Sequence, residues 1–282
     1  DMFRLPGIFR TVSLTAKPMV QVRDLVAKPA LDDTYTNGSL NITAYVRNLG
    51  EKKAKKYSLS YTLYANDLYS DSNRKVEGVS ANLPIVELKP GQEQAFNITL
   101  QAGTVKPWSA EAPWCYVLVG ELKDKKGNVV ETFSTTVGFR EVEIKDTAAE
   151  NDEFGKAGRY YYLNGKPIKL RGGCIHHDLG IVGAASFKKL EQRRIRAMKA
   201  AGYNAIRSAH FPASKTLLEV CDEEGMLVMN EFSDAWTSGK TDFDYAAFFP
   251  SCWEEDAQAL VKTSYNHPSV VMYSIGNEIL EC

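Results

Sequence analysis

Hydrophobic and polar residues alternate in short runs through the first half of the chain, up to about residue 145. This alternation is typical of strands that face a core on one side and water on the other. Turn signals separate the runs, and about seven such strands predict an immunoglobulin-like β-sandwich over residues 19–145, without the Cys…Trp…Cys core of antibody domains. The clearest runs are Leu40–Val46, Tyr57–Tyr64, Ala95–Leu100, Tyr116–Leu122 and Glu131–Val137, and the turn signals are Asn37-Gly38, Asn48–Gly50, Lys89–Gly91 and Lys126–Asn128.

Residues 1–18 fit this sandwich poorly. Gly7–Leu14 has the composition of a single strand, and Lys17-Pro18 that of the link after it. We therefore expect residues 1–18 to be the last strand of an earlier domain that is mostly missing.

The second half, residues 146–282, has a different rhythm. Residues 146 to about 160 are polar, and we interpret them as an interdomain connection. Beyond them, strand-like runs alternate with amphipathic helical segments, which predicts a parallel sheet. The strand-like runs are Ile168–Cys174, Ala205–Ser208, Met226–Asn230 and Val270–Ile275, and the helical segments are Leu190–Ala201, Ser214–Glu224 and Cys252–Ser264, with Gly202 and Gly225 where helix C-caps belong.

The last strand-like run delivers a carboxylate. Val270–Ile275 is almost continuously apolar between Pro268 and Gly276, which suits a strand buried on both faces. Asn277 and Glu278 then place an amide and an acid at the carboxyl end of that strand, where parallel folds carry their chemistry. Because the chain stops at Cys282, just past this candidate, we expect it to be a fragment.

Functional side chains follow each predicted strand, and three of the four histidines are among them. A dinucleotide-binding sheet would need G-x-G-x-x-G after its first strand, which Arg171–Cys174 does not provide. The pattern instead favours the catalytic edge of a (β/α)8 TIM barrel, of which these units make the first half. The residues are His176, His177 and Asp178, then Arg207 and His210, then Asn230, Glu231, Asp234 and Trp236, and finally Asn277 and Glu278.

A metal centre is the alternative interpretation of this cluster. Two ligands from one strand require the spacing H-x-H, because adjacent side chains point to opposite faces. His176-His177 therefore brings at most one imidazole into the site. We predict no metal-ligating residues and no cofactor, and leave open a structural divalent cation at Glu231 or Glu278.

Composition excludes several classes of partner. A net charge of −1 gives no electrostatic reason to bind nucleic acid or an anionic membrane, and no apolar stretch approaches the length of a membrane span. The cysteines are odd in number, widely spaced and without a C-x-x-C pair, so we expect free thiols and neither a disulfide framework nor a zinc site. They are Cys115, Cys174, Cys221, Cys252 and Cys282.

Several motifs together resemble glycoside hydrolase family 2, which contains β-galactosidases, β-glucuronidases and β-mannosidases. Gly7–Arg10 is similar to the end of the family's N-terminal sugar-binding sandwich, and residues 19–145 to its immunoglobulin-like second domain. Asn164–Gly172 is similar to the entry into its barrel. The most specific pair is Asn204–Pro212, which resembles the second-strand motif, and His267–Glu278, which resembles the fourth-strand acid/base motif.

The resemblance implies roles for individual residues. Glu278 corresponds to the general acid/base, and Asn277 to the residue that orients the sugar near its 2-hydroxyl. The magnesium ligands of some members have no clear match in Phe232–Trp236. The resemblance also implies that His176, Arg207 and His210 line the sugar subsite and that Glu231 supports it. From its ring type alone, Trp236 is either a stacking platform for a sugar ring or a packing residue.

Retaining glycoside hydrolysis needs two carboxyl groups about 5–5.5 Å apart, one as acid/base and one as nucleophile. In this family the nucleophile comes from a later strand, beyond Cys282. We therefore expect a fragment of a retaining exo-β-glycosidase, β-galactosidase-like, that is inactive alone. The alternative is a non-catalytic carbohydrate-binding or scaffold protein. A half barrel leaves open strand edges and an apolar face, so we also expect homo-oligomers or self-association, or else cover of that face by the sandwich of the same chain.

Overall fold

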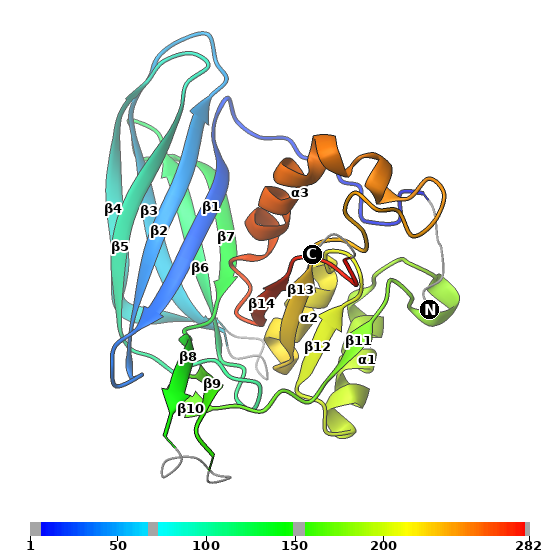
Figure 1. Cartoon of the computed structure of the whole chain (residues 1–282). Coiled ribbons are helices and arrows are strands. Elements are labelled where there is room, and N and C mark those ends of the chain that lie inside the picture. The colour runs from blue at the N-terminus through cyan, green and yellow to red at the C-terminus, as the bar shows by residue number, and fades with distance from the viewer. Residues whose placement is uncertain (1–6, 67–72, 149–155, 280–282) are drawn as a thin grey trace. The chain divides into compact units, whose positions relative to one another are not determined.

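The structure is a computed structural model that describes residues 7–66, 73–148 and 156–279 (Figure 1). The described chain forms two compact units. The sandwich unit contains Ser13–Ser109 and Trp114–Pro167. The parallel-sheet unit contains the chain from Ile168 onward together with residues 7–12 and Ala110–Pro113. Within the described ranges, we find no helix with the length and apolar character needed to span a membrane.

The sandwich unit confirms the predicted antiparallel β-sandwich. One sheet has the strand order β1-β2-β5 and the other β4-β3-β6-β7, with all neighbours antiparallel. Every second residue of β2 is buried, which is the expected result of a strand with one face on the core. The strands are β1 (Val20–Leu31), β2 (Asn37–Asn48), β3 (Ala54–Asn66), β4 (Asn73–Leu88), β5 (Glu93–Thr104), β6 (Cys115–Lys123) and β7 (Val129–Val137).

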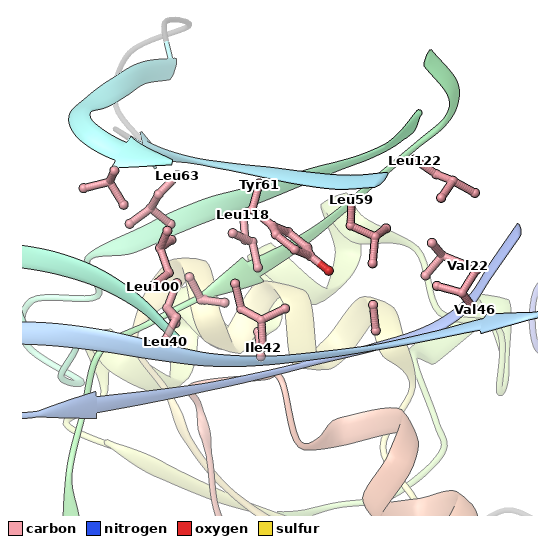
Figure 2. Packing of buried hydrophobic residues seen from close by; sticks show 14 of the residues in the cluster. Val22, Leu40, Ile42, Val46, Leu59, Tyr61, Leu63, Leu100, Leu118 and Leu122 are labelled. Carbon is pink, nitrogen blue, oxygen red and sulfur yellow. The ribbon is translucent and has the colours of Figure 1, made fainter. Parts of the chain in front are cut away.

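The core of the sandwich lies between the two sheets (Figure 2). Leu40 and Ile42 from β2 face Leu59 and Leu118 from β3 and β6, and all four side chains are fully buried. Their burial removes apolar surface from water, which contributes about 25 cal/mol for each Å².

The turn between β1 and β2 lies earlier than the predicted Asn37-Gly38 turn, since β2 begins at Asn37. The Asp32 carboxylate builds the turn by accepting the backbone N–H groups of Thr36 at 2.9 Å and Asn37 at 3.2 Å. These hydrogen bonds hold the pKa of Asp32 well below its usual value. Gly38 serves packing instead, because a Cβ at this position would lie 2.6 Å from the ring of Phe139.

A small sheet occupies the place of the predicted connection. β8 (Val142–Thr147), β9 (Gly158–Leu163) and β10 (Lys166–Pro167) pair antiparallel, and the sandwich unit extends to Pro167. Residues 149–155, in the middle of the predicted connection, lie outside the described residues. The sequence prediction missed β9 because the residues before Gly158 are polar, although the tyrosines of β9 favour a strand.

Residues 7–18 contain no strand, which contradicts the prediction for Gly7–Leu14. A strand is stable only when its backbone groups pair with another strand, and none of the described strands pairs with this segment. Residues 1–6 of the predicted element lie outside the described residues.

The parallel-sheet unit has the predicted strand-helix alternation. The strands β11 (Gly172–Ile175), β12 (Ala205–Ser208), β13 (Leu227–Glu231) and β14 (Val270–Ser274) are neighbours in this order, and all pairs are parallel. Their carboxyl ends therefore lie along one edge of the sheet. The connections carry α1 (Lys188–Ala200), α2 (Lys215–Glu224), α3 (Phe249–Ser264) and the short 3-10 helices η2 (Gly180–Val182) and η3 (Tyr245–Ala247).

One face of the parallel sheet packs on α1 and α2. Ile206 and Val228 from neighbouring strands join Ile195 of α1 and Leu218 of α2 in one buried cluster. The alternation of side chains along a strand then sends the residues on either side of Ile206 and Val228 to the opposite face. That opposite face carries the candidate site.

Local signals define the ends of α2. The Ser214 hydroxyl accepts the N–H of Leu217 at 3.1 Å and caps the first turn. Gly225 ends the helix in the left-handed conformation with φ +75°, as its position in the sequence predicts. A side chain here would also collide with the Ala110 carbonyl oxygen, which lies 2.3 Å from the Cβ position.

Candidate active site

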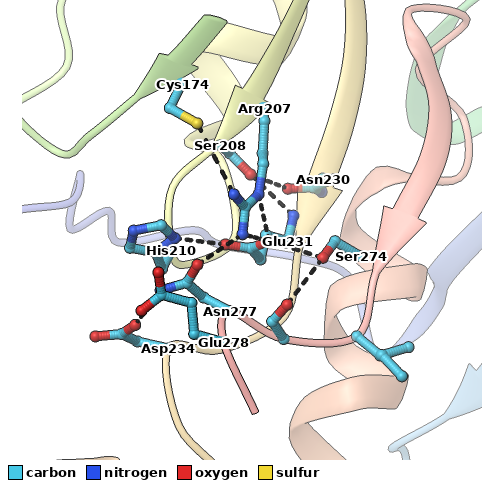
Figure 3. Close-up of polar contacts among 12 residues, drawn as sticks. Cys174, Arg207, Ser208, His210, Asn230, Glu231, Asp234, Ser274, Asn277 and Glu278 are labelled. Carbon is cyan, nitrogen blue, oxygen red and sulfur yellow. Dashed lines mark hydrogen bonds and ion pairs between the residues drawn. The ribbon is translucent and has the colours of Figure 1, made fainter. Parts of the chain in front are cut away.

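Arg207 and Glu231 stand on neighbouring strands and on the same face of the sheet, opposite the helices (Figure 3). Asn230, next to Glu231 in sequence, points to the helix side. Its side-chain oxygen accepts hydrogen bonds from the Ser208 hydroxyl and the Ala213 N–H, and the residue is fully buried. The strand alternation thus separates a structural amide from a carboxylate that faces the site.

Glu231 is the centre of the site. Its carboxylate is wholly buried and accepts hydrogen bonds from Arg207 Nε at 2.6 Å and Ser274 Oγ at 2.7 Å. The Nδ1 atom of His210 lies 2.7 Å from the other carboxylate oxygen. Burial lowers the pKa of Arg207, but the hydrogen bond and the negative charge of Glu231 together raise it by more. The pKa of Arg207 therefore lies above its usual value.

Asn277 is held through each of its polar groups. Arg207 Nη2 donates to its side-chain oxygen at 2.9 Å, and its side-chain nitrogen donates to Asp234 at 2.8 Å. Its backbone N–H donates to the Ser233 carbonyl at 3.1 Å, and its own carbonyl accepts from Lys240 at 2.6 Å. These bonds connect β14 to β12 and to the loop after β13, and they fix the residue that precedes Glu278.

Glu278 differs from its neighbours in exposure and in backbone. Its side chain is 83% exposed, whereas that of Glu231 is 0% exposed. Its φ is +47°, in the left-handed region that residues other than glycine adopt at a cost of about 1–2 kcal/mol. Strained residues of this kind concentrate at functional sites, where the surrounding contacts enforce the conformation.

The two adjacent histidines point to different surroundings. The His176 ring meets the His210 ring edge to face at 5.1 Å between centroids, and its buried Nδ1 has no hydrogen-bond partner among the described residues. Burial and the neighbouring His210 lower the pKa of His176. His177 packs between the rings of Phe9 and Phe211, and burial lowers its pKa to about 4.

Trp236 lies just beyond β13 and has one face covered. Its ring stacks on Phe249 with centroids 5.9 Å apart, and its Nε1 donates to the Ile275 carbonyl at 3.0 Å. Both contacts anchor the ring beside the end of β14. The role of Trp236 as a platform for sugar stays a prediction.

The structure adds residues to the site that sequence reasoning missed. Ser274 donates to Glu231, and Lys240 contacts Asp234 at 3.0 Å. The register of β13 and β14 pairs Ser274 with Glu231, but this register contains a shift, and simple alternation from the helix-side Val270 would have placed Ser274 on the opposite face. No local pattern identifies Lys240, which lies in the irregular segment before η3.

Among the described residues, no group of three or more His, Cys, Asp or Glu side chains is arranged to hold a metal ion. Of the described cysteines, Cys115, Cys174, Cys221 and Cys252 form no disulfide, and Cys282 lies outside the described residues. Burial raises the pKa of the Cys221 thiol well above its usual value, which makes it unreactive.

Both halves of the chain match sequence profiles of one family of carbohydrate-cleaving proteins. Residues 20–140 match the profile of glycosyl hydrolases family 2, and residues 157–281 match the family's TIM barrel domain. The chain belongs to glycosyl hydrolases family 2.

Named relatives agree with the family. The chain is 35% identical over 195 residues to the β-galactosidase BoGH2A of Bacteroides ovatus, which covers 69% of this chain and 22% of that protein. It is 30% identical over 290 residues to a β-galactosidase of Priestia megaterium, which covers 99% of this chain and 26% of that protein. The chain therefore spans about a quarter of the length of the curated relatives it matches.

Solved structures show the same fold. A family 2 member from Bacteroides cellulosilyticus is 30% identical, with a TM-score of 0.82 over 97% of this chain and 34% of that one. A β-glucuronidase from Bacteroides uniformis is 26% identical, with a TM-score of 0.72 over 91% of this chain and 28% of that one.

The buried carboxylate at Glu231 gives a stability prediction. Glu231→Ala leaves the partly buried Arg207 without its partner, so we expect the parallel-sheet unit to lose about 3–5 kcal/mol of unfolding free energy. Urea denaturation measures this loss. Glu219→Ala is the control, because it removes an exposed pair with Lys215 at 3.7 Å and should cost less than about 1 kcal/mol. Equal losses in the two variants would contradict the central place of Glu231.

The low pKa of His177 gives a pH prediction. Its pKa is about 4 in the folded chain and about 6.5 when unfolded, so the unfolded state binds the proton first as the pH falls. The histidine therefore lowers stability as pH drops from about 6.5 to 4. We expect His177→Phe, which keeps an aromatic ring between Phe9 and Phe211, to flatten this dependence. Denaturation at several pH values tests it, and an unchanged slope refutes it.

Proposed function

We propose that the chain is the central part of a retaining exo-β-glycosidase, β-galactosidase-like, in which Glu278 is the general acid/base. The observation that carries the proposal is the exposed Glu278 carboxylate, held in a left-handed backbone at the carboxyl edge of a parallel sheet. An exposed carboxylic acid at this edge can reach a substrate, whereas the wholly buried carboxylate of Glu231 beneath it cannot.

In the proposed mechanism, Glu278 acts in both half-reactions. In the first, Glu278 donates a proton to the glycosidic oxygen as the bond from that oxygen to the anomeric carbon breaks and the nucleophile bonds to that carbon. In the second, Glu278 takes a proton from water as the water oxygen attacks the same carbon and displaces the nucleophile. Asn277, beside it, is placed to bind a sugar hydroxyl.

The remaining candidates have supporting roles in this proposal. Arg207 has guanidinium atoms, and His210 has ring atoms, that do not contact Glu231. In this proposal those atoms line the sugar subsite. His176, with its unpartnered Nδ1 atom, lies against His210 and extends the same surface. Glu231 acts by holding Arg207 and His210, and the outer face of Trp236 is the stacking surface for a sugar or aglycone ring.

The nucleophile belongs to another part of the enzyme in this proposal. Glu231 is buried beneath three polar partners, and Asp234 is engaged by Asn277 and Lys240. The hydrogen bonds to Asp234 outweigh its burial and lower its pKa, which makes it a weak nucleophile. We therefore place the second carboxylate on a later strand of a complete (β/α)8 barrel and expect the present chain alone to be inactive.

The substrate class follows from the named relatives. The relatives in sequence are β-galactosidases and the matched structures include β-glucuronidases, so the proposed substrate is a terminal β-linked sugar. These names do not favour the alternative of a non-catalytic carbohydrate-binding or scaffold protein. We propose no nucleic acid or membrane partner.

Glu278→Gln tests the proposed function. In a protein that carries the complete barrel, we expect this change to slow hydrolysis of aryl β-glycosides by about 10²–10⁴-fold, because Gln can neither donate nor accept the proton. The panel is the galactoside, glucuronide, mannoside and glucoside, and the preferred sugar names the specificity. Unchanged turnover in Glu278→Gln would overturn the assignment. Activity in the present chain without the rest of the barrel would overturn the proposed split of the site.

The open face of the sheet leads to a proposal about assembly. An apolar hollow of about 250 Å³ lies over this face, between Cys174, Ala205, Met229 and Met272. We propose that later strands cover it in the complete enzyme and that a second copy covers it in the isolated chain. Sedimentation of the isolated chain should therefore show concentration-dependent association, which Met229→Glu weakens. A monomer at all concentrations would contradict the proposal.

A further inference from the structure

Lys240 lies in the loop after β13, and its backbone is fixed there. The Asp244 carboxylate accepts the N–H groups of Lys240 at 2.7 Å, Thr241 at 3.1 Å and Ala246 at 2.9 Å. These bonds fold the loop around one carboxylate and lead it into η3. The Lys240 side chain therefore starts from a defined position.

The Lys240 ammonium group reaches three oxygen atoms, two in the residues after β14 and one in the loop after β13. It donates to the Asn277 carbonyl at 2.6 Å and to Asp234 Oδ1 at 3.0 Å, and it lies 3.9 Å from Glu278 Oε2. Its side chain is only 26% exposed, compared with 82% for Lys215 in an ordinary surface pair. An ammonium group held by two fixed acceptors loses less freedom on each contact than a surface lysine does.

The contact with the Asn277 carbonyl has a consequence for Glu278. That carbonyl belongs to the peptide bond that joins Asn277 to Glu278, so Lys240 fixes the plane from which the strained Glu278 backbone starts. The same Asp234 oxygen accepts from Lys240 and from the Asn277 side chain. Lys240 is thus tied both to the residue that orients the sugar and to the proposed acid/base.

We infer that Lys240 is a positioning residue for the acid/base function of Glu278. The inference rests on the proposed function. Proton donation to the glycosidic oxygen converts Glu278 into a carboxylate, and the Lys240 ammonium group lies 3.9 Å from its Oε2 atom. Lys240 also keeps Glu278 aimed at the glycosidic oxygen through the Asn277 peptide. It does not itself exchange a proton with the substrate.

Leaving groups of different basicity test the inference. A methyl glycoside needs a proton on its leaving oxygen, whereas a 2,4-dinitrophenyl glycoside leaves without one. In the complete enzyme, with the sugar that the panel selects, we expect Lys240→Met to lower kcat/KM about 10-fold or more for the methyl glycoside and less than about 3-fold for the dinitrophenyl glycoside. Lys240→Arg keeps the charge and should restore part of the loss.

Two comparisons make the result interpretable. Lys215→Met removes a lysine from an exposed pair of similar length, 3.7 Å, and should leave both substrates unchanged. Equal losses of kcat/KM on both glycosides in Lys240→Met, or no loss on either, would overturn the inference. Glu278→Gln run beside it separates the two claims. If Glu278→Gln itself lacks the leaving-group dependence, the proposed function fails, and if it shows the dependence while Lys240→Met does not, only the role of Lys240 fails.

Discussion

A buried carboxylate at Glu231 is the constraint on which the rest of the site depends. Removing a charge from water is expensive, and the cost is offset only where fixed donors surround the charge. Arg207, His210 and Ser274 provide those partners, and they come from or directly follow β12 and β14, the two neighbours of β13. The carboxyl ends of three strands are therefore held together by one side chain.

The same arrangement continues outward to the exposed acid. Arg207, fixed by Glu231, donates a hydrogen bond from Nη2 to the side-chain oxygen of Asn277, and Asn277 donates in turn to Asp234. These contacts hold the backbone that places Glu278 in its left-handed conformation. The inner part of the network is buried, and its last residue, Glu278, is open to solvent. A general acid requires both a fixed support and access to the substrate.

The sequence predicts a large share of this structure because alternation and strand ends have simple physical causes. The period of two identifies the sandwich strands, and the position of polar residues at strand ends predicts that Arg207, His210, Glu231, Asn277 and Glu278 are neighbours. The same reasoning misses β8 and β9, whose short runs stand beside polar residues. It also predicts a strand at Gly7–Leu14, where no partner strand is available among the described residues.

Sequence reasoning is weakest where a side chain acts across a loop. Lys240 reaches Asn277 over 37 positions, and nothing in its immediate neighbours indicates this contact. Trp236 shows the opposite limit. Its ring type suggests sugar stacking, but packing on Phe249 already uses one of its faces, and a pattern cannot reveal which face a neighbour covers.

A double-mutant cycle on kcat/KM in the complete enzyme tests most directly whether Glu231 organises the site. The variants are Glu231→Gln, Asn277→Ser and the two combined. If Glu231 acts by fixing Arg207 and through it Asn277, the second change costs little once the first is made, and the cycle gives a coupling of about 1–3 kcal/mol. Independent effects, with a coupling below about 0.5 kcal/mol, would contradict the dependence of Asn277 on the buried carboxylate.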